Sequence, residues 1–358
     1  MNAWDIWAWP WAATMEIWRR SLELAGTELE TAAVESHARA PPEAPEWTTP
    51  NRVALELAAL RLRDFSTASD RNPVVVVAPF ALHDAQLADL APGHSLLEAL
   101  LRDGCTHLHL VEWKSATSAT RLHTIDTQLA SLNVAIDDVG LPVDIIGLCQ
   151  GGWLSLVYAA RFPAKVRRLV LVGAPIDIRA EPSALTTPIS SLSDVVIDEL
   201  TRHGDGVLLG RDMTALWPRE YDEERRIRDS LQLSAPLTTD AAGEAVEIFT
   251  RWDRRPLDLP APYYCQVFDW LYRENRLATG AFPALGRTID LRNLRCPLFL
   301  LAGAQDAIAP PAQAFAAARL VGTSEIETTL APCGHLALFM GRLTLGTEWP
   351  RVAQWLQK

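Results

Sequence analysis

The chain has 358 residues, and its 49% apolar content is enough for a buried core in one large domain or two smaller ones. Its 44 acidic residues outnumber 33 basic ones, and the formal net charge of -11 argues against nucleic acid and anionic membranes as main partners. Five cysteines without C-x-x-C spacing indicate neither a zinc site nor a disulfide framework, and no apolar run reaches the roughly eighteen residues of a transmembrane segment, so we expect a cytoplasmic protein.

The N-terminal segment, residues 1–50, is rich in tryptophan, with Trp4, Trp7, Trp9, Trp11 and Trp18 among its first eighteen residues. Its pattern predicts a helix from Pro10 toward Glu30, followed by a proline-rich linker that ends near residue 50. We expect this helix to pack on its own domain. Docking on a partner or on the surface of a hydrophobic particle is the alternative.

From Pro73 onward, short apolar runs alternate with helical patterns. The predicted strands are 73–79, 106–113, 143–148, 166–175, 296–306 and 324–330, and the predicted helices lie near 95–103, 125–139, 150–162, 311–320 and 348–356. Such alternation is typical of a mostly parallel sheet with helices on both faces. The sequence therefore predicts an α/β core formed by residues 51–177 and 293–358.

The alternation stops between residues 178 and 292, where the sequence becomes helical and irregular. An insertion of this length between two parts of one sheet is too long for a loop. We therefore expect a helical cap subdomain over residues 178–292.

Cys149 stands where the predicted strand 143–148 passes directly into a helical pattern, in the run Gly147-Leu148-Cys149-Gln150-Gly151. This is the pattern G-x-nucleophile-x-G in the strand-to-helix context that it requires. The nucleophile at such a turn adopts a strained conformation, and the two glycines avoid clashes of a Cβ atom. The helix N-terminus favours the thiolate. The pattern predicts that Cys149 is a nucleophile rather than a small buried side chain.

A nucleophile of this kind needs a histidine base and an orienting acid, which follow it in the order acid, then histidine. Asp306 stands just beyond the strand PLFLLAG, the apolar part of the run 296–306, and His335 stands just beyond SEIETTL, each at a carboxyl end where such loops converge. Asp306 and His335 are therefore the predicted acid and base. Asp177 is the rival acid.

The oxyanion hole requires two backbone N–H groups near the nucleophile. We expect one from Gln150, which follows the nucleophile, and one from Phe80, because the preceding Pro79 has no N–H. His107 and His109 lie at alternate positions of one predicted strand, but no further ligand lies at suitable spacing. We expect no metal.

Cysteine in place of the more usual serine bears on the reaction. An acyl group that arrives as a thioester stays a thioester on cysteine, so it remains activated for transfer to an alcohol. The residue type favours acyl transfer from a donor such as an acyl-CoA, with a cap that excludes water. Hydrolysis on the same scaffold is the alternative.

Four stretches of the sequence resemble polyhydroxyalkanoate synthases, particularly the class III type that works with a companion subunit. The resemblance covers most of residues 70–358 and is weaker in the cap, where Trp252-Asp253 is its clearest anchor. It is carried by residues 73–104, by IIGLCQGGWLSLVYAARFPAKVRRLVLVGAPIDI (145–178), by IDLRNLRCPLFLLAGAQDAIAPP (289–311) and by APCGHLALFMG (331–341).

The resemblance implies an α/β-hydrolase fold with a mobile cap that polymerises (R)-3-hydroxyacyl-CoA. Cys149 would be the nucleophile, His335 the base, and Asp306 an acid that activates either His335 or the incoming hydroxyl. Coenzyme A would enter only as part of the substrate, with no separate cofactor. The expected partners are the hydroxyacyl-CoA, the polyester chain and a companion synthase subunit or a second copy, in the cytoplasm or on polyester granules.

Three positions depart from the usual pattern of that family. Ala307 follows the acid where a histidine is usual, the loop PFALHD lacks the usual asparagine, and Cys333 replaces a glycine. These changes leave the predicted triad intact but alter its surroundings. Two alternatives therefore stay open: a polyhydroxyalkanoate depolymerase or other (thio)ester hydrolase with a Cys-His-Asp triad, and a granule-surface scaffold that docks through its N-terminus.

Overall fold

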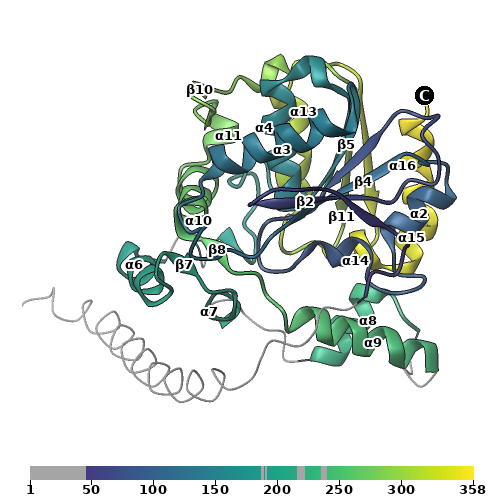
Figure 1. Cartoon of the computed structure of the whole chain (residues 1–358), viewed down its shortest axis with the longest axis horizontal. Helices are drawn as coiled ribbons and strands as arrows, with labels where there is room; N and C mark the ends of the chain where they lie inside the picture. The colour runs from purple at the N-terminus through teal and green to yellow at the C-terminus, as the bar shows by residue number, and fades with distance from the viewer. Residues whose placement is uncertain (1–45, 187–188, 190–191, 216–221, 235–239) are drawn as a thin grey trace, which may run out of the picture. The chain divides into compact units, whose positions relative to one another are not determined.

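The computed structural model describes residues 46–186, 189, 192–215, 222–234 and 240–358, all within one unit of the chain, Ala44–Lys358 (Figure 1). The predicted N-terminal helix and most of the predicted linker lie outside these residues. Residues 46–50 are described, and Thr49 is buried there: its N–H donates to Asp89 Oδ2 at 2.9 Å and its hydroxyl to Oδ1 at 2.7 Å.

A central eight-stranded sheet confirms the predicted fold class. Its strand order is β1-β2-β4-β3-β5-β6-β11-β12, with the β1–β2 and β2–β4 pairs antiparallel and the remaining pairs parallel. The strands are β1 (Arg52–Glu56), β2 (Leu60–Asp64), β3 (Val74–Val77), β4 (Leu108–Trp113), β5 (Val143–Leu148), β6 (Val166–Val172), β11 (Leu298–Gly303) and β12 (Ile326–Ala331).

Helices cover both faces of this sheet (Figure 1). Val75 and Val77 of β3 face a core shared with α3 (Ile125–Val139) and α4 (Gln150–Arg161). Val74 and Val76 face the other core, which is shared with α2 (Leu96–Arg102), α14 (Ala337–Met340), α15 (Arg342–Thr347) and α16 (Trp349–Leu356). Shorter elements complete this part: η1 (Ala85–Ala88), η2 (Pro163–Lys165), α12 (Pro311–Phe315) and α13 (Ala317–Leu320).

Between β6 and β11, the described residues add no strand to the large sheet. This part of the chain packs on both cores: Tyr263 and Phe268 join the core of α4, and Trp252 joins the other. Its elements are α6 (Asp194–His203), β7 (Val207–Leu208), α7 (Gly210–Ala215), α8 (Glu223–Leu231), α9 (Asp240–Asp253), β8 (Leu259–Pro260), α10 (Ala261–Gln266), the π-helical η3 (Val267–Arg273), α11 (Arg276–Thr279), β9 (Pro283–Ala284), β10 (Arg287–Thr288) and η4 (Leu291–Asn293).

The β1–β2 hairpin is absent from the sequence-based prediction. β1 is exposed along most of its length, so its side chains carry little of the apolar signal that marks a buried strand. Within the described part of the chain, no helix has the length and apolarity that crossing a bilayer would require.

Candidate active site

Cys149 occupies the sharp turn between β5 and α4. Its backbone has φ 49° and ψ -115°, a positive φ that is unfavourable for a side chain with a Cβ atom. The Cys149 N–H donates to the carbonyl oxygen of Val172 on the adjacent β6 at 2.9 Å, which ties the turn to the sheet. The strained geometry thus places the cysteine at the carboxyl edge of the sheet, at the N-terminus of α4.

The two glycines of the motif are required by close backbone contacts. A Cβ atom at Gly147 would lie 2.6 Å from the Cα atom of Gly152, and one at Gly151 would lie 2.2 Å from the carbonyl oxygen of Val77. Real Cβ atoms do not approach other atoms so closely. Glycine at Gly151 therefore lets the first turn of α4 pack directly on the end of β3.

His335 and Asp306 lie in the loops that follow β12 and β11. The Nδ1 atom of His335 lies 2.7 Å from Oδ2 of Asp306, and the carboxylate is fully buried. Its other oxygen accepts the N–H groups of Ile308 and Ala309 at 2.9 and 2.8 Å. Both oxygens are thus engaged, and the carboxylate is held in one orientation toward the imidazole.

The imidazole of His335 also interacts with Cys149. Burial alone would lower the pKa of His335, but the charges of Asp306 and Cys149, and the hydrogen bonds that the imidazole makes to both side chains, raise it well above its ordinary value. The structure therefore brings together Cys149, His335 and Asp306, the three residues that the sequence singled out. The arrangement can transfer a proton between sulfur and imidazole.

The rival acid, Asp177, has other partners. It accepts a hydrogen bond from Nδ2 of Asn275 at 2.7 Å and pairs with the guanidinium of Arg319. The carboxylate that contacts His335 is that of Asp306. The described residues hold no group of three or more His, Cys, Asp or Glu side chains that could bind a metal ion.

Phe80 and Gln150 are the residues whose N–H groups we predict to form an oxyanion hole. Phe80 lies in the loop after β3, with its ring buried between Trp113 and Tyr263 at centroid distances of 5.6 and 4.9 Å. Gln150 begins α4, where an N–H has no partner within its helix. Among the described residues, neither backbone N–H has a hydrogen-bond acceptor. Both donors are free to bind a ligand oxygen.

Three buried tyrosines near Cys149 were missed by the sequence reasoning. Burial raises the pKa of Tyr263, Tyr264 and Tyr272, and a negative charge on Cys149 raises each further. The Tyr272 hydroxyl accepts a hydrogen bond from the Gln150 side chain at 2.8 Å. These phenols stay neutral at physiological pH. They come from α10 and η3, and their spacing matches no short motif that would have identified them.

The fold agrees with the family comparison. The family model described as "alpha/beta hydrolase fold" matches residues 115–341. The chain belongs to the alpha/beta hydrolase fold family. Within it, the chain is similar to the protein named "Poly(3-hydroxyalkanoate) polymerase subunit PhaC" from several organisms, which confirms the resemblance seen in the sequence.

Two of these relatives and one solved structure illustrate the similarity. The Allochromatium vinosum protein is 24% identical over 81% of this chain and 82% of its own length. The Haloferax mediterranei protein is 23% identical over 97% of this chain and 72% of its own length. The crystal structure of Paleococcus ferrophilus monoacylglycerol lipase is 15% identical, with a TM-score of 0.54 over 83% of this chain and 98% of that one. The lipase shares the fold.

Proposed function

We propose that the chain is a polyhydroxyalkanoate synthase-like acyltransferase that polymerises (R)-3-hydroxyacyl-CoA through a thioester on Cys149. The observation that carries the proposal is the Asp306–His335 pair, 2.7 Å apart, beside a cysteine at the turn before α4. The similarity to poly(3-hydroxyalkanoate) polymerases supports the choice of substrate.

In the first half of the reaction, His335 takes the thiol proton of Cys149 and the sulfur attacks the thioester carbonyl of hydroxyacyl-CoA. The oxyanion that forms accepts hydrogen bonds from the N–H groups of Gln150 and Phe80. The carbon–sulfur bond to coenzyme A then breaks, and the leaving thiolate takes the proton from His335. The products are free coenzyme A and an acyl group in thioester linkage to Cys149.

In the second half, the hydroxyl of another hydroxyacyl unit or of the chain end attacks the Cys149 thioester. His335 accepts the hydroxyl proton, an ester bond forms, and the proton returns to the departing sulfur of Cys149. Asp306 stabilises the imidazolium in both halves. Its two oxygens are already engaged by His335 and by backbone N–H groups, which favours this role over direct activation of the incoming hydroxyl.

The buried tyrosines from the cap suit transfer to an alcohol. Tyr263, Tyr264 and Tyr272 are buried, neutral and largely apolar, and they lie close enough to Cys149 for its charge to raise their pKa values. Water at the cysteine would compete with the hydroxyl acceptor. Excluding water from the acyl-enzyme therefore favours polymerisation. A hydrolase of the same layout is the second candidate, because Ala307 and Cys333 alter the surroundings of the acid and the histidine.

A companion subunit or a second copy of the chain completes the proposal, since the relatives are named as subunits of a polymerase. We also propose that the protein acts in the cytoplasm at the surface of polyester granules. Light scattering tests the assembly state of the purified chain. Fractionation of granules with and without residues 1–40 tests the localisation, and unchanged association after the deletion would contradict docking through this segment.

The test is a product assay with (R)-3-hydroxybutyryl-CoA that measures released coenzyme A, free hydroxy acid and polymer together. The wild type is expected to release coenzyme A and form polymer, and Cys149→Ala to do neither. Cys296→Ala is the matched control, because burial raises the pKa of that thiol to about 12 and it lies before β11, at the opposite edge of the sheet. Free hydroxy acid in place of polymer would establish the hydrolase. If no coenzyme A is released from this substrate or from acyl-CoA substrates of other lengths, both candidate functions are contradicted.

A further inference from the structure

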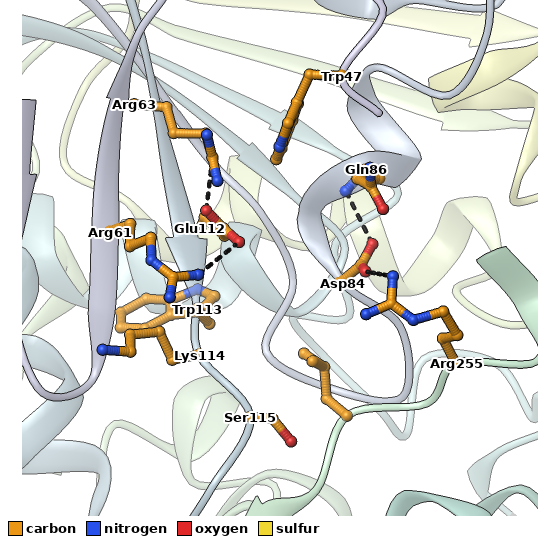
Figure 2. A pocket seen from close by; sticks show the side chains of 11 residues that line it. Trp47, Arg61, Arg63, Asp84, Gln86, Glu112, Trp113, Lys114, Ser115 and Arg255 are labelled. Atoms are coloured by element: carbon orange, nitrogen blue, oxygen red, sulfur yellow. Dashed lines mark hydrogen bonds and ion pairs between the residues drawn. The ribbon is translucent and has the colours of Figure 1, made fainter. Parts of the chain in front are cut away.

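A cavity lies beside β2 and β4 of the sheet, and Cys149 is not among the residues that line it. Its volume is about 370 Å³. Figure 2 shows Arg61, Arg63 and Glu112 of the sheet on one side and Asp84 and Arg255 on the other. With Lys114, the lining holds four cationic side chains and two carboxylates, an excess of positive charge in a chain whose net charge is -11.

The carboxylate of Glu112 is already neutralised on the sheet side. Arg61 Nη1 donates to one of its oxygens at 3.3 Å, and Arg63 Nε donates to the other at 2.6 Å. The Arg63 guanidinium also lies over the ring of Trp47, 4.5 Å from its centroid. Glu56, outside the lining, accepts hydrogen bonds from Arg61 Nε at 3.2 Å and from Lys114 Nζ at 2.9 Å. Three cations against two carboxylates leave this side of the cavity with one net positive charge.

Arg255 on the opposite side has unfilled hydrogen-bonding capacity. Its Nε and Nη1 atoms are buried and have no hydrogen-bond partner among the described residues. The nearest carboxylate oxygen, Asp84 Oδ2, lies 3.9 Å from Nη1, beyond hydrogen-bonding distance. Buried donors without an acceptor cost stability, and a bound acceptor would remove that cost.

We propose that this cavity binds a small oxyanion, a carboxylate or phosphate group of a metabolite, held by the guanidinium of Arg255 opposite the arginines of β2. Planar guanidinium groups suit the oxygens of both groups, and the positive lining attracts them electrostatically. The bound anion would supply the acceptor that Arg255 lacks.

The cavity adjoins the loop that carries Phe80. Trp113 lines the cavity, donates its indole N–H to the Ala78 carbonyl at 2.9 Å and stacks on the Phe80 ring. Leu257, two residues after Arg255, donates its N–H to the Leu82 carbonyl at 2.7 Å. An anion on Arg255 would hold this chain segment against the loop. If the proposed function is right, binding of an anion in this cavity would alter the oxyanion hole.

Calorimetric titration of the full chain tests the site directly, with inorganic phosphate, 3-hydroxybutyrate and coenzyme A as separate probes at constant ionic strength. We expect saturable binding of at least one probe, with a Kd at least about tenfold higher in Arg255→Gln. Phosphate and coenzyme A binding would indicate a phosphate source; binding of 3-hydroxybutyrate alone would indicate a carboxylate. Arg251→Gln is the matched control, because Arg251 pairs with Glu247 on the exposed side of α9.

The proposal is overturned if no probe binds saturably, which would mean a solvent-filled cavity, or if Arg255→Gln binds as tightly as the wild type. If Arg255→Gln fails to fold, Arg255→Lys takes its place, with an intermediate loss of affinity expected because the planar fork is missing. Each titration is repeated in Cys149→Ala. Binding abolished by that change would place the probe at the catalytic site and would also overturn the proposal.

Discussion

The Nδ1 atom of His335 lies 2.7 Å from Oδ2 of Asp306, while the other oxygen of Asp306 is held by the backbone N–H groups of Ile308 and Ala309. The carboxylate thus has a fixed direction, which in turn fixes the imidazole plane. With Nδ1 directed at Asp306, Nε2 is the ring nitrogen left for Cys149, the second side chain that bonds to His335. The contact between His335 and Asp306 therefore sets the geometry of the proposed proton transfer.

Asp306→Asn removes the charge that stabilises the imidazolium while nearly keeping the shape of the side chain. We expect kcat to fall by at least about 100-fold, with the fold retained. The pH–rate profile should also change, because the Asp306 charge is the largest contribution that raises the pKa of His335. Steady-state kinetics across pH measures both effects.

Asp177→Asn is the matched control for this acid. Asp177 pairs with Arg319 and Asn275 and does not contact His335, so folded Asp177→Asn should keep most of its activity. Equal losses of kcat in the two variants would contradict the assignment of Asp306.

Gly151→Ala tests the packing of the turn. The added Cβ atom would lie 2.2 Å from the Val77 carbonyl oxygen, so α4 must move away from β3, and we expect a loss of about 3 kcal/mol in the free energy of unfolding. Gly243→Ala is the control, because a Cβ atom there meets nothing within 4 Å on α9. It should stabilise the chain by up to about 1 kcal/mol. Urea unfolding measures both, and similar effects would refute the packing argument.

Asp253 at the end of α9 joins the segment between β6 and β11, the predicted cap, to the loop that carries Phe80. Arg226 binds its two oxygens at 3.1 and 2.6 Å, and His83 Nε2 lies 3.3 Å from Oδ1. The His83 ring stacks on that of Trp252, with centroids 4.5 Å apart. Burial alone would raise the pKa of Asp253. The hydrogen bonds and charges of His83 and Arg226 outweigh this effect, so the pKa of Asp253 lies below its ordinary value.

Asp253→Asn should therefore destabilise the chain by about 1 to 2 kcal/mol and make the cap more sensitive to limited proteolysis. Glu247→Gln breaks an exposed ion pair with Arg251 on the same helix and should cost about 0.5 kcal/mol or less. Thermal unfolding and proteolysis rates compare the two variants. Equal rates of cap cleavage in both would show that the cluster does not hold the cap.

His109 gives a pH-dependent prediction. Burial lowers its pKa from 6.5 to about 4, although the nearby Asp64 opposes the change. Because the folded-state pKa is below the unfolded-state value, the contribution of His109 to stability is complete above about pH 6.5 and is lost as the pH falls toward 4. The loss should reach about 3 kcal/mol. The wild type should lose more free energy of unfolding than His109→Gln when the pH falls from 7.5 to 4.5, and the two losses should differ by roughly this amount. Equal losses in the wild type and the variant would contradict the burial effect.

Much of the fold could be predicted because buried parallel strands are continuous apolar runs. The strand 143–148 and the helix 125–139 were predicted with the bounds that the structure shows. The exposed β1 was missed because an edge strand needs no such run. The cap elements were only predicted as helical in general, since their apolar positions follow the irregular surface on which they pack.

The candidate site was predictable where local backbone geometry constrains the sequence. The strained turn at Cys149 requires glycines at Gly147 and Gly151, and this leaves a readable motif. Asp306 and His335 followed from strand order. The tyrosines of α10 and η3 could not be found this way, because only the folding of the cap brings them to the cysteine.

The most direct test of the account is the identity of the atom that carries the acyl group. Wild-type protein mixed with (R)-3-hydroxybutyryl-CoA is quenched in acid within the first turnover, and its peptides are mapped by mass spectrometry. The account predicts a hydroxybutyryl group on the peptide that contains Cys149, formed together with released coenzyme A and absent from Cys149→Ala. Coenzyme A release that persists in Cys149→Ala, or an acyl group on another residue, would contradict it.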